Sequence, residues 1–566
     1  MAKAGSWQEV AKAKREAIAE SIPQPWRIDA IPSAAEQRDV TGDYVHQWLS
    51  QEEIEITEMD AVDIVEKTSA GIWSAEDVAR AFCHRASLAH QLVNCLLETF
   101  FDAAIEDAKQ LDAYFAKHKA PIGPLHGLPV SLKDQFHVKG VETSMGYVGW
   151  IGTFQGQKGT GRERVFESEM VKELRSLGAI LFCKTSVPHT LMSGETINHI
   201  LGYTWNPKNR NLSAGGSSGG EGALIGMKGS PVGFGTDIGG SVRIPAAFNG
   251  LYGLRPSAGR LAYEGMSNSM DGQNSVLSVV GPISHSVASL KLLVQALLSQ
   301  DPWLHDPLVH EIPWRHKCEQ ETIDLINSSR HGSEKLAFGI LEHDGQVTPH
   351  PPVQRAMKII KETLRRLNHK IIDWEPPEHK RGAEILYKAW VFDGGADIHS
   401  SLKLSGEPPV PQVTPLYGHE PFQGFSASEI AATNVKKREY QKEYMEYWNS
   451  TRDQTGTGRP VDALIMPVAP FAAARREQCK YYGYTTIVNV LDYTACTVPV
   501  TCSNQNIDIA SPDFKPVSEL DQDIMATYDP ALYDGAHVAV QIVGRRLQEE
   551  KILAIAEHIG QAIHSD

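Results

Sequence analysis

In the first part of the chain the apolar residues recur every three or four positions, which is the spacing of amphipathic helices. Pro23 ends the first such pattern, and Ser74 with Asp77 has the form of a capping box that begins the third. We therefore expect four helices, at Met1–Ser21, Thr57–Ser69, Ser74 to about Leu92, and Phe101–Phe115.

Between residues 124 and 134 the period changes. Leu128, Val130 and Leu132 alternate with other residues, which predicts a strand that ends at Lys133. A helix and a short apolar strand are expected next, at Glu163–Leu177 and Ala179–Cys183. Strands that alternate with helices of this length are typical of an α/β sheet.

After Pro256 the same alternation is less regular. The expected strands are 335–341, 370–374, 463–468 and 538–544, and the expected helices are 289–299, 352–367, 426–447 and 549–563. Residues 400–425 are rich in proline and glycine, so we expect a long surface excursion there. We find no internal repeat. The pattern predicts one large α/β domain at 76–566, preceded by a helical N-terminal extension at 1–75.

Composition excludes several classes of protein. The chain has 566 residues, 42% hydrophobic and 22% charged, which is typical of globular proteins. A formal net charge of −15 argues against general binding to nucleic acid or to an anionic membrane surface. The N-terminal region lacks the apolar core of a secretory signal, and no run approaches about 18 apolar residues. We expect a cytoplasmic protein with neither nucleic acid nor membrane as a partner.

The seven cysteines are scattered and odd in number, and none forms a C-x-x-C pair. This distribution favours neither a zinc site nor a disulfide framework. We therefore expect free thiols in a reducing compartment, and no metal.

The candidate chemistry is concentrated between Gly215 and Pro245, where 11 of 31 residues are glycine. The glycines flank Ser217, Ser218 and Ser241. Glycine lets a substrate approach the backbone and leaves N–H groups free to point at it. The stretch also contains apolar helical and strand-like pieces, which flexible linkers lack. We interpret it as a catalytic loop system.

Other motifs fit this stretch less well. Gly215–Gly219 satisfies G-x-S-x-G, the nucleophile elbow of α/β-hydrolases, which would make Ser217 the nucleophile of a Ser-His-Asp esterase. That motif needs a preceding strand, whereas Asn209–Ala214 is turn-forming. A dinucleotide loop needs G-x-G-x-x-G, and the run from Gly233 lacks the third glycine.

From Gly215 to Ala246 the chain resembles the amidase signature family. Ser217 and Ser241 lie 24 residues apart, as the two serines of that family do. The other matching positions are Asp237, Gly239, Arg243, Pro245, Asn206, Pro207 and the lysine strand at 124–134. The resemblance spans roughly residues 75–560. The region of Trp7 and the run Gly395–His399 look most like the fungal acetamidase and general amidase branch.

The resemblance implies a mixed, twisted central sheet covered by helices on both faces. It also implies that Ser241 is the nucleophile, Ser217 the proton relay and Lys133 the base, joined by a continuous chain of contacts. A lysine is a base only when uncharged, and burial favours that form. The family's relay serine follows a cis peptide bond, so Gly216–Ser217 is expected to be cis. No metal and no cofactor are implied.

The same resemblance extends to the residues around the serines. The backbone N–H groups expected to stabilise the negative charge of the transition state are those of Ile238, Gly239, Gly240 and Ser241. Asp237 and Arg243 are expected to hold this loop by hydrogen bonds, and Ser218 either supports the relay or is a structural hydroxyl. The matching acyl-pocket segment is Leu191, Met192 and Ser193, where a backbone carbonyl would hold the substrate NH₂. Further candidates for the pocket wall are Tyr147, Trp150 and 481–497.

The expected activity is that of a serine amidohydrolase. It would convert small carboxylic amides, aliphatic or aryl, to acid and ammonia through an acyl-enzyme on Ser241. The alternatives are a carbamate, ester or fatty-amide hydrolase of the same fold, the Ser217 esterase, or a glutamine-amidating subunit of a tRNA-modifying complex. The expected partner is a small-molecule amide, and a homodimer is possible.

Overall fold

Eleven strands form one sheet at the centre of the computed structural model, which describes residues 6–330 and 335–564. In spatial order they are β1 (Leu96–Thr99), β3 (Ile180–Thr185), β2 (Pro129–Lys133), β6 (Val232–Asp237), β8 (Val279–Ser284), β7 (Tyr252–Arg255), β12 (Ala495–Cys502), β13 (His537–Val543), β11 (Ala463–Pro467), β9 (Ala337–Ile340) and β10 (Lys370–Asp373). The runs β3–β2–β6 and β11–β9–β10 are parallel, and the remaining neighbours are antiparallel. The mixed sheet implied by the resemblance is confirmed.

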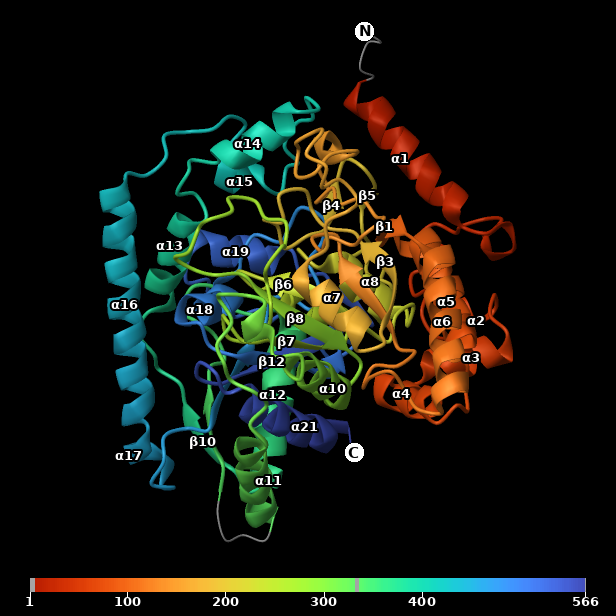
Figure 1. Ribbon diagram of the computed structural model, residues 1–566. Helices are drawn as coiled ribbons and strands as arrows, with labels where there is room; N and C mark the ends of the chain where they lie inside the picture. The colour runs from red at the N-terminus through yellow and green to blue at the C-terminus, as the bar shows by residue number, and fades with distance from the viewer. Residues whose placement is uncertain (1–5, 331–334, 565–566) are drawn as a thin grey trace.

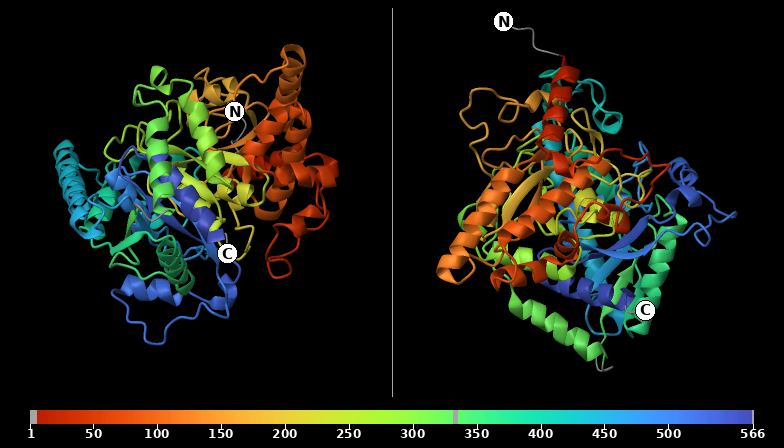
Figure 2. Two further views of the ribbon diagram at one scale, coloured as in Figure 1. Left: turned by 90° about the horizontal axis from the view of Figure 1, so that it is seen from below. Right: turned by 90° about the vertical axis from the view of Figure 1, so that its right-hand side faces the viewer.

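Helices cover both faces of this sheet, because successive side chains of a strand point to opposite sides. In β11, Ala463 and Ile465 belong to one buried cluster, whereas Leu464 and Met466 belong to another. The first cluster includes α7 (Glu169–Ser176), α10 (Val287–Leu298), α12 (Pro351–Arg366) and α21 (Glu549–His564). The second cluster includes α13 (His379–Ala389) and α18 (Gly483–Leu491), and a smaller third cluster joins α8 (Gly219–Gly226) to α9 (Arg243–Phe248). Figures 1 and 2 show these layers from three directions.

The remaining helices pack around these layers. They are α1 (Trp7–Ser21), α2 (Asp43–His46), α3 (Gln51–Glu58), α4 (Ala61–Ser69), α5 (Ala75–Val93), α6 (Phe101–His118), α11 (His316–Arg330), α14 (Ala396–Lys403), α15 (Thr414–Tyr417), α16 (Ala427–Ser450), α17 (Arg452–Thr455), α19 (Glu519–Ala526) and α20 (Pro530–Tyr533). Helices α1 and α16 lie on opposite sides of the molecule (Figure 1). None of the described helices combines the length and the apolar composition needed to cross a membrane.

The N-terminal helices differ in part from the prediction. The single helix expected at Thr57–Ser69 is wrong, because α3 ends at Glu58 and α4 begins at Ala61. Asp60 causes the break, since its side chain accepts the N–H of Val62 and caps α4. The helix expected from Met1 begins at Trp7, and residues 1–5 lie outside the described residues.

The expected surface excursion at 400–425 is also wrong in part. This segment contains α15, and the side chains of Val410, Val413 and Tyr417 are buried in one cluster with Tyr147. Pro415 stands in the first turn of α15, where proline needs no N–H partner. The prolines therefore shape a segment that packs inward, and part of it lines the cavity beside Ser241.

Candidate active site

The site lies at one edge of the sheet, where two parallel strands end together. Lys133 is the last residue of β2, and Thr236 and Asp237 end the neighbouring strand β6. Ser217 stands in the loop before α8, and Ser241 stands between β6 and α9. Crevices at the carboxyl ends of parallel strands are the usual binding positions of α/β sheets.

Lys133 contacts the predicted relay serine directly. Its Nζ lies 2.8 Å from Ser217 Oγ, and it also donates to Thr236 Oγ1 at 2.8 Å. The side chain is fully buried, and burial lowers the pKa of Lys133 to about 7, against the opposing influence of Asp237 and Glu221. A large fraction of this amine is therefore uncharged at neutral pH, as a general base requires.

The predicted contact between the hydroxyls of Ser217 and Ser241 is not formed in the described residues. The Gly216–Ser217 peptide is cis, as expected. Among residues 6–330 and 335–564, however, no hydrogen bond joins the hydroxyls of Ser217 and Ser241. The two loops are connected through the backbone, where the N–H of Ser218 donates to the Ser241 carbonyl at 3.2 Å. The expected continuous contact chain is thus present at its lysine end only, and Ser241 lines the adjacent cavity.

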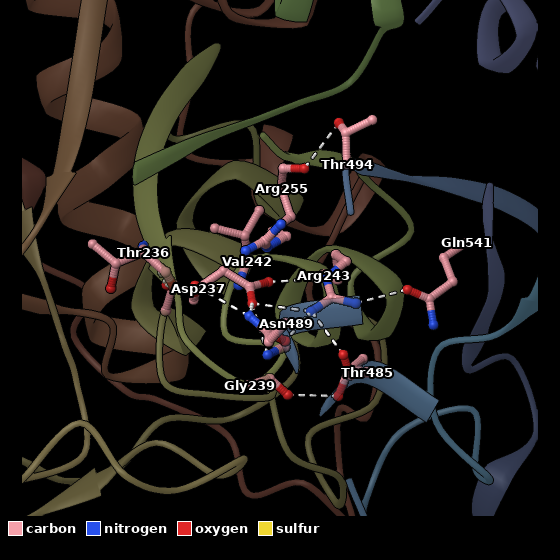
Figure 3. A network of polar contacts seen from close by, with 12 residues as sticks. Thr236, Asp237, Gly239, Val242, Arg243, Arg255, Thr485, Asn489, Thr494 and Gln541 are labelled. Atoms are coloured by element: carbon pink, nitrogen blue, oxygen red, sulfur yellow. Dashed lines mark hydrogen bonds and ion pairs between the residues drawn. The ribbon is translucent and has the colours of Figure 1, made fainter. Parts of the chain in front are cut away.

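Asp237 and Arg243 hold the loop of Ser241, as the resemblance implied (Figure 3). The guanidinium donates to both carboxylate oxygens at 3.0 Å, and both side chains are fully buried. Arg243 also donates to Asn489, Thr485 O and Gln541, which come from α18 and β13. The ion pair and the surrounding donors hold the pKa of Asp237 well below its usual range. The loop is therefore fixed from three segments of the chain.

The oxyanion donors need one correction. The N–H of Gly240 donates to Asp237 Oδ1 at 2.8 Å, so it is not free for a substrate. The N–H groups of Ile238, Gly239 and Ser241 donate to no protein acceptor in the described part of the chain. The prediction for Gly240 is therefore wrong, because Asp237 uses its N–H to shape the turn, and the other three donors stay predictions.

The two glycines of this turn make room for neighbouring side chains. A Cβ on Gly239 would lie 2.4 Å from the ring of Trp390. Gly240 has φ +129°, and a Cβ there would lie 2.5 Å from Thr485 Oγ1, which donates to Gly239 O. A larger residue at either position would clash with Trp390 or Thr485.

Ser218 fits the structural alternative. Its side chain is fully buried, and its hydroxyl lies against β6, where it contacts the backbone of Thr236. A Cβ on Gly235 would lie 2.5 Å from this hydroxyl, so the strand passes close to it. Ser218 therefore packs the loop against the sheet.

A cavity of about 750 Å³ opens beside Ser241. Leu191, Met192 and Ser193, the predicted acyl-pocket residues, all line it. A Cβ on Gly216 would lie 2.5 Å from the Ser193 carbonyl oxygen. This carbonyl therefore lies next to the loop that carries Ser217, as expected. The other walls are mainly apolar and include Ile244, Ala383, Tyr387, Trp390, Leu416 and Tyr482.

The remaining wall candidates divide into two groups. Tyr481 and Tyr482 line the cavity. Tyr147 and Trp150 do not; they are buried in the cluster that also contains Val410, and the Tyr147 hydroxyl contacts Ser269 at 3.1 Å. Sequence reasoning missed Tyr387, Trp390 and Leu416, which belong to α13, its C-terminal end and α15, all far beyond Ser241 in the chain.

Comparison with known proteins agrees with this geometry. A sequence profile of the family described as Amidase matches residues 77–553. The chain belongs to the Amidase family. It is 45% identical over 558 residues to an acetamidase of Emericella nidulans, covering 99% of this chain and 98% of that protein. It is 44% identical to an acetamidase of Aspergillus oryzae, covering 99% of each chain. The solved structure of a fatty acid amide hydrolase superposes with a TM-score of 0.88 at 31% identity, covering 99% of this chain and 95% of that one.

This amidase has two polar groups near Lys133 that the sequence reasoning missed. Glu221 is fully buried and accepts hydrogen bonds from Ser131 at 2.6 Å and Thr185 at 2.8 Å. Burial raises the pKa of Glu221 to about 8. Gln135 follows Lys133 by two positions and accepts a hydrogen bond from Thr236 at 2.7 Å. In the sequence, Glu221 and Gln135 are marked only by being polar residues within segments whose side chains are buried.

His189, His199 and Glu407 form the one group among the described residues whose ligand atoms could surround a metal ion. The Nε2 of His189 accepts the N–H of Val410 at 3.1 Å. In a neutral imidazole the other nitrogen then carries the proton, so Nδ1, which lies 4.0 Å from Glu407, is not a free ligand. The hydrogen bonding of the group therefore disfavours a metal.

Proposed function

We propose that this amidase hydrolyses small carboxylic amides, aliphatic or aryl, to the acid and ammonia, through an acyl-enzyme on Ser241. Lys133 is the base, and Ser217 relays the proton. The observation that carries this proposal is the fully buried amine of Lys133, 2.8 Å from Ser217 Oγ and with its pKa lowered to about 7.

In the proposed first step, Ser241 Oγ attacks the amide carbonyl and loses its proton to Ser217, which passes a proton to the uncharged Lys133. The negative charge on the carbonyl oxygen is stabilised by the free N–H groups of Ile238, Gly239 and Ser241. The proton then returns through Ser217 to the leaving nitrogen, and ammonia departs. Water attacks the acyl-enzyme by the same route in reverse, which releases the acid. This step requires the Ser217 and Ser241 hydroxyls to approach in the substrate complex, and catalytic hydrogen bonds often tighten at that stage.

The cavity bears on which amides are used. Two relatives are named acetamidases, and one structural neighbour is named a fatty acid amide hydrolase. A space of about 750 Å³ with mainly apolar walls is within the range that holds drug-sized ligands. Amides with aryl or longer aliphatic acyl groups are therefore a second class of candidate substrate beside acetamide.

The esterase alternative finds little support. In the described residues the hydrogen-bond partner of the Ser217 hydroxyl is Lys133, and no strand precedes Ser217 within the loop from 209 to 216. A cytoplasmic location and a homodimer belong to the same proposal.

The test is to ask which serine is covalently modified. Wild type, Ser241→Ala and Ser217→Ala are treated with a fluorophosphonate, and the labelled peptide is identified by mass spectrometry. We expect the label on Ser241, no turnover of any amide by Ser241→Ala, and an intact fold in both variants. A label on Ser217, or wild-type ammonia release by Ser241→Ala, would contradict the proposal.

A further inference from the structure

A line of hydrogen bonds, buried at its inner end, leads from Lys133 away from Ser217. Lys133 Nζ donates to Thr236 Oγ1 at 2.8 Å, and Thr236 Oγ1 donates to Gln135 Oε1 at 2.7 Å. Gln135 Nε2 donates in turn to the Tyr263 hydroxyl at 2.9 Å and to Asn268 Oδ1 at 3.0 Å. Gln135 is 1% exposed and Thr236 3% exposed, so the bonds from Lys133 to Gln135 are shielded from water, whereas those to Tyr263 and Asn268 are part-buried.

The directions of these bonds are determined by the far end of the line. The Tyr263 hydroxyl donates to Asn268 Oδ1 at 2.7 Å, so towards Gln135 its oxygen can only accept. Gln135 must therefore present its NH₂ group to Tyr263 and Asn268, and its carbonyl oxygen to Thr236. An amide oxygen accepts only, which commits the single proton of the Thr236 hydroxyl to Gln135. Towards Lys133, Thr236 is then an acceptor.

We propose that Gln135 is a positioning residue that reserves the lone pair of uncharged Lys133 for the proton of Ser217. If the Thr236 hydroxyl were free to turn, it would donate to that lone pair and compete with Ser217. The inference rests on the proposed role of Lys133 as base. Because an amide does not readily pass a proton on, the line orients the base and is not a path for protons.

No other hydrogen bond of the described chain orients this amine. Among the described residues Lys133 Nζ forms hydrogen bonds with Ser217 and Thr236 alone, and the titratable groups that influence it, Asp237 from β6 and Glu221 from α8, are held by other partners. The orientation of Thr236 therefore decides which way the lone pair points.

The experiment compares Gln135→Met, Thr236→Val and the double variant with wild type, and uses Gln155→Met as a matched control. Gln155 is a part-buried glutamine bonded to His137 and Ser267, outside this line. The kcat and KM of amide hydrolysis are measured from pH 6 to 10. The rate at which a fluorophosphonate labels Ser241 is measured over the same range. Thermal melting checks each fold.

We expect Gln135→Met to lower kcat and the labelling rate by about tenfold or more, with KM nearly unchanged, since base catalysis contributes about 10²–10⁴-fold. In this variant the rise of kcat with pH should occur at lower pH, because a hydroxyl that donates to the uncharged Lys133 amine disfavours its charged form. The double variant, which lacks the competing hydroxyl, should be several-fold faster than Gln135→Met. The control should match wild type.

A double variant no faster than Gln135→Met, or wild-type kcat in Gln135→Met, would overturn the inference. Should Gln135→Met fail to fold, Gln135→Glu decides: its carboxylate still accepts from Thr236, so kcat at high pH should persist while the acid limb moves to higher pH. An unshifted limb in that variant contradicts the inference. Failure of the proposed function is separate, since it would appear as turnover by Ser241→Ala.

Discussion

Lys133 Nζ and Ser217 Oγ lie 2.8 Å apart, although the two residues are 84 positions apart in the chain. The lysine is fully buried, and burial lowers its pKa to about 7. The distance is short enough for the direct proton transfer that we propose between the two groups, and the pKa suits that role near neutral pH.

The pH dependence of acylation should report this lysine. The base is active when deprotonated, so kcat/KM should rise with pH through an acid limb near pH 7 and level off above it. Lys133→Ala should lower kcat/KM at neutral pH by roughly 10²–10⁴-fold and abolish that limb. Ammonia release from pH 6 to 10 measures both. An unchanged limb in Lys133→Ala would assign the titration to another group.

Breaking the Asp237–Arg243 pair should unfold the loop of Ser241. Asp237→Asn leaves the guanidinium in a fully buried site without its counter-charge, which typically costs about 3–5 kcal/mol. Urea unfolding measures this loss, and turnover should fall with it. Arg381→Ala, which removes an exposed pair with Glu443, is the control and should change stability by no more than about 1 kcal/mol. Equal losses in the two variants would show that the buried pair has no special role.

Glu173 should make the protein less stable as the pH rises. Its side chain is buried, both carboxylate oxygens lack a hydrogen-bond partner in the described chain, and burial raises its pKa to about 8 from an ordinary 4.5. The folded protein keeps this proton up to about pH 8, whereas the unfolded chain releases it near 4.5. The free energy of unfolding should therefore fall between these two values.

Glu173→Gln should remove that fall, since its amide does not titrate, and the variant should gain stability over wild type between pH 5 and 8. Denaturant titrations at both pH values measure the difference, with the exposed Glu446→Gln as control. Parallel stability curves for wild type and Glu173→Gln would show that Glu173 is not the responsible group.

Cavity size should decide which amides are accepted. Leu416 lines the wall beside Ser241, and Leu416→Trp would fill part of the space. We expect KM for a bulky aryl amide to rise by about tenfold or more, which corresponds to about 1.4 kcal/mol, while acetamide hydrolysis changes little. Leu404→Trp, at a position 54% exposed, is the control. A uniform loss for both substrates would place Leu416 in structural support instead.

Much of the architecture could be predicted from local pattern. The strand that ends at Lys133, the capped helix from Ser74 and the charged helix after residue 426 were identifiable because their periods extend over enough residues. The strand β7 was missed, since four residues are too few to show a period, and its position depends on pairing with β8 and β12.

In the site, too, local sequence predicted some features and missed those that depend on tertiary contacts. The spacing of Ser217 and Ser241 and the run after Thr236 identified the loop system, because such residues are adjacent in the chain. The use of the Gly240 N–H by Asp237, and the separation of the two serine hydroxyls, could not be predicted. These two features depend on the backbone conformation of the loops and on how the loops pack against each other.

By itself the sequence determined the chemical groups of this amidase: a lysine at a strand end, two serines among glycines, and the acid and arginine of one loop. Only the tertiary structure decided what surrounds them. Thr236 contacts Lys133 across 103 positions, and Trp390 and Leu416 close a cavity beside Ser241. Burial, hydrogen-bond direction and cavity volume arise from contacts between distant segments, and they set the pKa of Lys133 and the space beside Ser241.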